Sequence, residues 1–93
     1  MAITDAMYLD AACALTEGEG GFDRYQLARE VERRNGLDEY AANSRAAGAW
    51  LRRRARRGQG LRKVLAPTHG RGAEAAGWVV VELLLRDWRK AQG

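Results

Sequence analysis

The chain has 93 residues, of which 46% are hydrophobic and 30% charged, and its formal net charge at pH 7 is +4. This length is typical of one domain, and the balance of apolar and charged residues excludes an intrinsically disordered chain. The longest apolar run, residues 78–85, is interrupted by Glu82 and is too short to cross a bilayer. The acidic N-terminus lacks the basic leader of a signal peptide. We therefore expect one soluble domain over residues 1–93, located in the cytoplasm, with no membrane contact.

The charges are distributed unevenly along the chain. Residues 1–23 contain five acids and no Lys or Arg, whereas residues 45–63 contain eight bases and no acid. Such segregation is typical of a protein that binds a polyanion, although a run of charge can also be a solvated surface. Fourteen of the 16 bases are Arg, which suits bidentate contacts with phosphate and guanine.

Residues 3–16 predict a first helix, since they are rich in alanine and Thr4 or Asp5 can cap the N-terminus. Apolar side chains occupy much of its circumference, which indicates burial on more than one side. The glycine-rich residues 17–21 are expected to form a loop.

A second helix is expected over residues 24–34, with Asp23 as its N-cap and Phe22 entering the core just before it. Asn35 and Gly36 are expected to end it, because both tolerate the left-handed backbone conformation. Its inner stripe is predicted to be Leu27, Ala28 and Val31.

A third helix is expected to end at about Arg57, before Gly58-Gln59-Gly60, and to begin either at Asp38 or near Asn43. A step of about 100° per residue separates an inward stripe from an exposed face. The inward stripe is predicted to contain Tyr40, Ala47, Trp50, Leu51 and Ala55, with Arg54 leaning toward it. The exposed face is predicted to contain Ala42, Arg45, Ala49, Arg52, Arg53 and Arg56.

Residues 61–66 and 77–83 predict two strands, and the second is the richer in β-branched residues. With the loop 67–76 between them they form a hairpin. Residues 84–91 predict a short C-terminal element, which is either a helix with Leu84 and Trp88 on one face or an extension of the strand.

The residue types needed for catalysis are scarce. His69 and Cys13 are the only histidine and cysteine, so the chain can form neither an internal disulfide nor a zinc site from these two residues alone. No glycine-rich stretch has the spacing of a phosphate-binding loop. We therefore expect no enzyme, no cofactor and no metal.

The third helix carries the strongest functional signal. No acid occurs from Asn43 to Lys63, so the repulsion among its arginines is not relieved within the helix. A nucleic acid would supply the missing charge. In the hairpin loop Arg71 lies between Gly70 and Gly72, and an arginine presented in this way can enter a minor groove or contact a phosphate.

These features together resemble the winged helix-turn-helix proteins, an α+β fold. Residues 22–31 look like the second helix of that fold, and residues 47–58 look like its recognition helix with the glycine that ends it. Residues 61–64 and 77–81 look like the wing strands, with residues 68–74 as the wing. The resemblance covers about residues 5–83. It implies three helices, a two-stranded wing and a short C-terminal element.

The resemblance also implies that the third helix enters the major groove and that the wing contacts adjacent backbone or minor groove. Two features depart from the pattern: the link from Asn35 to about Asn43 is longer than a tight turn, and the recognition helix has few hydrogen-bonding residues besides Arg. The predicted DNA contacts are Asn43, Ser44, Arg45, Arg52, Arg53, Arg56, Arg57, Lys63, His69 and Arg71.

The sequence thus predicts a regulator of transcription that binds double-stranded DNA. A homodimer formed through the first helix or the C-terminal element would fit this function. One alternative is a phage or mobile-element protein that inhibits a host protein through the same scaffold, with the acidic first 23 residues and the apolar first helix as the partner surface. RNA binding is a second alternative.

Overall fold

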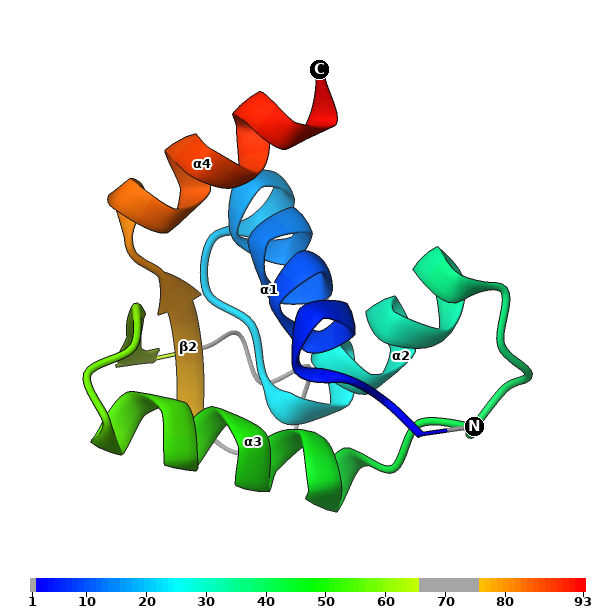
Figure 1. Ribbon diagram of the computed structural model, residues 1–93. Helices are drawn as coiled ribbons and strands as arrows, with labels where there is room; N and C mark the ends of the chain where they lie inside the picture. The colour runs from blue at the N-terminus through cyan, green and yellow to red at the C-terminus, as the bar shows by residue number, and fades with distance from the viewer. Residues whose placement is uncertain (1, 66–75) are drawn as a thin grey trace.

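The structure, a computed structural model, describes residues 2–65 and 76–93 (Figure 1). These residues form an α+β domain with four helices and a two-stranded antiparallel sheet, so the expected class is confirmed and the helix count is four instead of three. The elements are α1 (Asp5–Glu19), α2 (Arg24–Asn35), α3 (Ser44–Arg56), β1 (Leu61–Leu65), β2 (Ala76–Val80) and α4 (Glu82–Gln92).

Helix α1 lies at the centre of the fold. The Thr4 hydroxyl caps it by accepting a hydrogen bond from the Met7 backbone N–H at 3.2 Å. The helix packs against α2, β2 and α4, which confirms that it is buried on more than one side. It continues to Glu19, so the predicted loop over residues 17–21 was wrong for its first three residues. Continuing the helix satisfies backbone groups that a loop would leave to water.

The segment between α1 and α2 connects the helices to the sheet through backbone hydrogen bonds. The backbones of Phe22 and Trp78 exchange two N–H···O bonds of 3.0 and 2.8 Å, which form an isolated antiparallel bridge to β2. The Phe22 side chain is fully buried, as predicted. The core around it contains residues from α1, α2, α3, both strands and α4.

Strand β2 is shorter than predicted. It ends at Val80, and Val81 is the N-cap of α4, so the strand predicted to reach residue 83 was wrong at its end. The C-terminal element is therefore a helix of 11 residues. Leu85 is buried, and Leu84 and Trp88 pack against the core on the same helical face. This burial decides between the helix and the strand extension that the sequence left open.

Helix α2 matches its prediction closely. Asp23 and Gln26 exchange side-chain to backbone bonds of 2.8 and 2.9 Å, which form a capping box. The helix ends at Asn35, where Gly36 adopts the left-handed conformation with φ 63°. Its predicted inner stripe is confirmed, because the three side chains are fully buried: Leu27, Ala28 and Val31.

The long link between α2 and α3 is held by Arg29 and the buried Glu32, both on α2. The Glu32 carboxylate accepts a hydrogen bond from the Ala42 N–H at 2.8 Å, and Arg29 donates one to the Ala42 carbonyl at 2.6 Å. Arg29 also pairs with Glu32 at 2.8 Å and lies 4.5 Å from the centre of the Tyr40 ring. Helix α3 then begins at Ser44 with Asn43 as its N-cap, which selects the later of the two predicted starts.

Two predictions for this link were wrong. Tyr40 is 73% exposed, has φ 63° and precedes α3, so it does not belong to the inward stripe. Ala42 is buried and not on the exposed face. Both differences have the same physical reason. The Arg29 and Glu32 side chains form hydrogen bonds with the Ala42 backbone, and these bonds hold Ala42 in the core, so the link is not helical there.

Replacing Glu32 by Ala should destabilise the protein by about 1–3 kcal/mol, because the buried Ala42 N–H loses its acceptor. Urea denaturation monitored by circular dichroism measures this change. Glu39→Ala is the matched control, since Glu39 is an exposed acid in the same link. Equal unfolding midpoints for the two variants would contradict the role given to Glu32.

Asp10 of α1 connects this helix to α2 through an ion pair and to α4 through a hydrogen bond. The Asp10 carboxylate accepts hydrogen bonds from Arg34 at 2.6 and 3.1 Å and from the Trp88 indole N–H at 2.9 Å. The hydrogen bonds from Arg34 lower the pKa of Asp10, against the opposing effect of burial. The charged form of Asp10 therefore stabilises the folded chain.

This pKa predicts a pH dependence of stability. A carboxyl whose pKa is lowered by folding contributes stability above its unfolded pKa of about 3.9, and loses it as the pH falls through the folded value. Wild type should therefore exceed Asp10→Asn in unfolding free energy at pH 6, and the difference should shrink below about pH 4. Denaturation curves at a series of pH values measure it. A difference independent of pH would contradict the account.

Candidate nucleic-acid interface

Helix α3 is anchored to the core by one face. Ala47, Trp50 and Leu51 are buried there, as predicted. The Trp50 ring stacks on the Tyr8 ring of α1 with 5.1 Å between centroids, and its indole N–H donates to the Asp5 carboxylate at 2.6 Å. These contacts fix the rotation of α3 about its own axis, and with it the residues that face away.

The outward side chains of α3 are arginines. We call the four exposed ones the α3 basic face, and they are those predicted from the helical projection: Arg45, Arg52, Arg53 and Arg56. Small residues lie among them, since Ala46 is exposed and Ala49 is half-buried. Figure 1 shows α3 and α4 on opposite sides of α1.

The arginines of the basic face have no acid partner within residues 2–65 and 76–93, whereas most bases of the other helices do. Arg29 and Arg33 pair with Glu32 and Glu30, and Arg34 pairs with Asp10. Arg89 pairs with Glu17 and Glu82, so Arg86 and Lys90 are the bases of α4 that have no acid partner among residues 2–65 and 76–93. Ion pairs with acids therefore neutralise most bases of α2 and α4, whereas the positive charge of the α3 basic face is not neutralised by any acid of the described residues.

Arg54 is the exception on α3, and it leans inward as predicted. Its guanidinium lies 3.1 Å from the Asp5 carboxylate and donates to the Gln59 carbonyl at 2.8 Å. Asp5 lies 49 residues away in sequence, so this partner was not foreseen. The repulsion predicted for the arginine run is thus partly relieved by α1.

The remaining predicted contacts lie at the ends of α3 and on β1. The Asn43 side-chain oxygen accepts hydrogen bonds from the backbone N–H groups of Arg45 and Ala46 at 2.8 and 3.2 Å, so it caps the helix. Ser44 is half-buried, while Arg57 and Lys63 are exposed. His69 and Arg71 lie outside the described residues.

Arg24, the first residue of α2, lies beside the basic face and was not predicted. Gly48 of α3 is buried beneath it: a Cβ on Gly48 would lie 3.0 Å from Cδ of Arg24 and 3.3 Å from a guanidinium nitrogen of Arg52. The missing side chain lets α2 approach α3 closely and brings the two arginines together. The glycine within a helical pattern was the available signal, since such a residue often marks a close approach.

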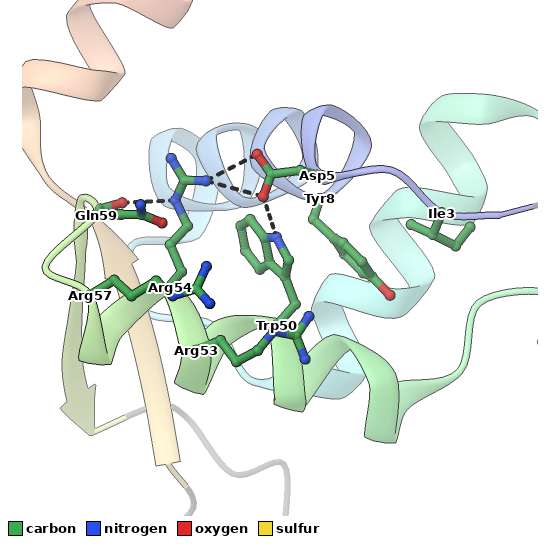
Figure 2. Close-up of a pocket in the computed structure, with 8 residues that line it drawn as sticks. All are labelled: Ile3, Asp5, Tyr8, Trp50, Arg53, Arg54, Arg57 and Gln59. Carbon is green, nitrogen blue, oxygen red and sulfur yellow. Dashed lines mark hydrogen bonds and ion pairs between the residues drawn. The ribbon is translucent and has the colours of Figure 1, made fainter.

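A polar cavity of about 240 Å³ opens between the start of α1 and the second half of α3 (Figure 2). Burial raises the pKa of the Tyr8 hydroxyl, which keeps it protonated and able to donate; Arg53 opposes this more weakly. The residues that line the cavity are Ile3, Asp5, Tyr8, Trp50, Arg53, Arg54, Arg57 and Gln59.

Other reactive groups are few in the described ranges. Burial raises the pKa of the Cys13 thiol to about 11, so the nucleophilic thiolate is scarce at neutral pH. No cluster of three or more His, Cys, Asp or Glu side chains suited to a metal occurs within residues 2–65 and 76–93. None of the helices seen there is both long and apolar enough to cross a membrane.

Comparisons of this chain with protein-family models, with curated proteins and with solved structures found no match.

Proposed function

We propose that this protein binds double-stranded DNA as a winged helix-turn-helix regulator of transcription, with α3 in the major groove. The hairpin β1–β2 would act as the wing on adjacent backbone or minor groove. The observation that carries the proposal is the uncompensated charge of α3. Its exposed arginines form no ion pair within the described part of the chain, although acids pair with most bases of α2 and α4.

The order of the elements supports the winged-helix assignment. Helices α1, α2 and α3 precede an antiparallel hairpin in which Leu61 pairs with Val80 and Leu65 with Ala76. The bridge between Phe22 and Trp78 ties this hairpin to the helices. Helix α4 is then an addition after the wing.

The side chains of α3 suit close contact with a duplex. Ala46 and Ala49 add little bulk among the arginines, so the helix backbone can approach the floor of a groove. The arginines reach outward from there, and a guanidinium can form paired hydrogen bonds with a guanine edge or with a phosphate. Arg24 extends the same charge to the start of α2.

Binding of duplex DNA over a series of salt concentrations tests this function. If the four arginines of the basic face each neutralise one phosphate, log affinity should fall with log salt with a slope of about −3.6. Random genomic fragments serve as the ligand, and sequencing the bound fraction reports any preferred site. Absence of duplex binding at low salt would overturn the proposal.

The alternatives are separated by two further measurements. An RNA duplex of the same length, used as competitor, shows whether DNA is the preferred polyanion. A pull-down from nuclease-treated lysate tests the hypothesis that the protein inhibits a host protein. That hypothesis requires a stoichiometric protein partner that is still recovered after nucleic acid has been removed. The inhibitor hypothesis needs α1 as part of the partner surface. Helix α1 already packs against α2, β2 and α4, which argues against this hypothesis.

A further inference from the structure

We propose that the cavity between α1 and α3 is a binding site for a phosphate group. It lies at the side of α3, and its arginines come from the last turn of that helix, Arg53 and Arg54, and from its C-cap, Arg57 (Figure 2). Tyr8 and Asp5, from the first turn of α1, form the facing wall. The inference does not require that the protein bind DNA, because a free phosphate compound would use the same groups.

The charges that line this cavity do not balance. Three guanidinium groups face one carboxylate, that of Asp5. This carboxylate is already occupied: Oδ1 accepts from the Trp50 indole at 2.6 Å, and both oxygens lie 3.1–3.2 Å from Arg54. Arg53 and Arg57 have no acid partner among residues 2–65 and 76–93. The site therefore carries two unneutralised positive charges, which match the charge of a phosphate dianion.

The spacing of the two free arginines suits one shared ligand. Arg53 and Arg57 are four residues apart on consecutive helical turns, so their side chains are neighbours and repel one another when no anion lies between them. A phosphate has enough oxygens to accept paired hydrogen bonds from both guanidinium groups.

A neutral donor completes the site. Tyr8 and Gln59 also line the cavity, at its opposite ends in Figure 2, and the Tyr8 hydroxyl on the side of Arg53 can donate to a phosphate oxygen. A cavity of about 240 Å³ accommodates such a group together with bound water.

The indole N–H of Trp50 provides a local reporter, and that of Trp88 provides its control. Each donates to an aspartate that also binds an arginine, Asp5 for the first and Asp10 for the second, but only Trp50 lines the cavity. Titration with inorganic phosphate at constant ionic strength, followed by ¹⁵N NMR, should shift the Trp50 signal saturably and leave the Trp88 signal in place.

The variant Arg53→Gln with Arg57→Gln should bind phosphate at least about tenfold more weakly, since two charge-assisted contacts are lost. The charge-matched control is Arg86→Gln with Lys90→Gln on α4, which should retain the wild-type titration. Both arginines of the test pair are exposed, so the variant should fold, and its unchanged Trp88 signal verifies this. A Trp50 shift of equal size in the variant would overturn the site.

A second titration with a short DNA duplex identifies the source of the phosphate. If the duplex shifts the Trp50 signal and competes with inorganic phosphate, the site holds a backbone phosphate. If inorganic phosphate shifts the signal and the duplex does not, the site holds a free phosphate compound, and this result stands whether or not DNA binds elsewhere. If neither ligand moves the Trp50 signal, the proposal is wrong.

Discussion

Replacing Arg52 and Arg56 together by Ala is expected to weaken duplex binding about 100-fold at about 0.1 M salt. A hydrogen bond to a charged group contributes about 1.5–3 kcal/mol, so two lost contacts cost at least about 3 kcal/mol. The slope of log affinity against log salt should also fall by about two if both arginines bind phosphates. Both side chains are exposed, so stability should change by less than about 0.5 kcal/mol each. Fluorescence anisotropy with a labelled duplex measures both quantities.

The control for this variant is Arg86→Ala with Lys90→Ala. It removes the same charge from exposed positions of α4, across the molecule from α3 (Figure 1). We expect a modest loss of affinity from the lower net charge alone. Equal losses for the two double variants would mean that net charge, and not the α3 basic face, determines binding.

Phe22→Ala is expected to lower the free energy of unfolding by about 3–5 kcal/mol, which is the cost of removing a fully buried aromatic side chain. A small domain has about 5–15 kcal/mol in total, so this variant should lose much of its stability. The effect should be large because Phe22 lies where the helices meet the sheet, through its bridge to Trp78. Thermal unfolding monitored by near-ultraviolet circular dichroism measures it.

Leu83→Ala is the matched control for Phe22→Ala. Leu83 is also a large apolar residue, but it is 65% exposed on α4. Its replacement should change the unfolding free energy by less than about 0.5 kcal/mol. A similar loss in both variants would contradict the core that the structure assigns around Phe22.

The features predicted from sequence are those that local chemistry determines. Thr4 and Asp23 cap helices because their side-chain oxygens meet free N–H groups within three residues. Gly36 ends α2 because it adopts a positive φ without strain. The inner stripes of α2 and α3 follow from helical periodicity alone, which also gave the outward direction of the arginines.

The features that were missed depend on contacts distant in sequence. Tyr40 and Ala42 were misplaced because the path of the link is set by Glu32 and Arg29, which lie on the preceding helix. The boundary between β2 and α4 was misplaced because a short apolar run fits either period, and the packing of Leu85 against the core decides it.

The same reasoning applies to the candidate interface. The inward lean of Arg54 was predicted, but its partner Asp5 was not, because 49 residues separate them. The position of Arg24 over Gly48 likewise depends on how α2 crosses α3. The cavity is lined by residues from the start of α1 and the end of α3 that lie far apart in the sequence, so no local pattern predicts it.

The central claim is that the exposed side of α3 contacts duplex DNA, and ¹⁵N NMR mapping tests it most directly. On addition of a short duplex, the largest amide and guanidinium shifts should occur at Arg45, Arg52 and Arg56, while the signals of the exposed Arg86 and Lys90 on α4 should stay in place. Shifts concentrated on α4, or no shift on α3 when the duplex is bound, would contradict the account.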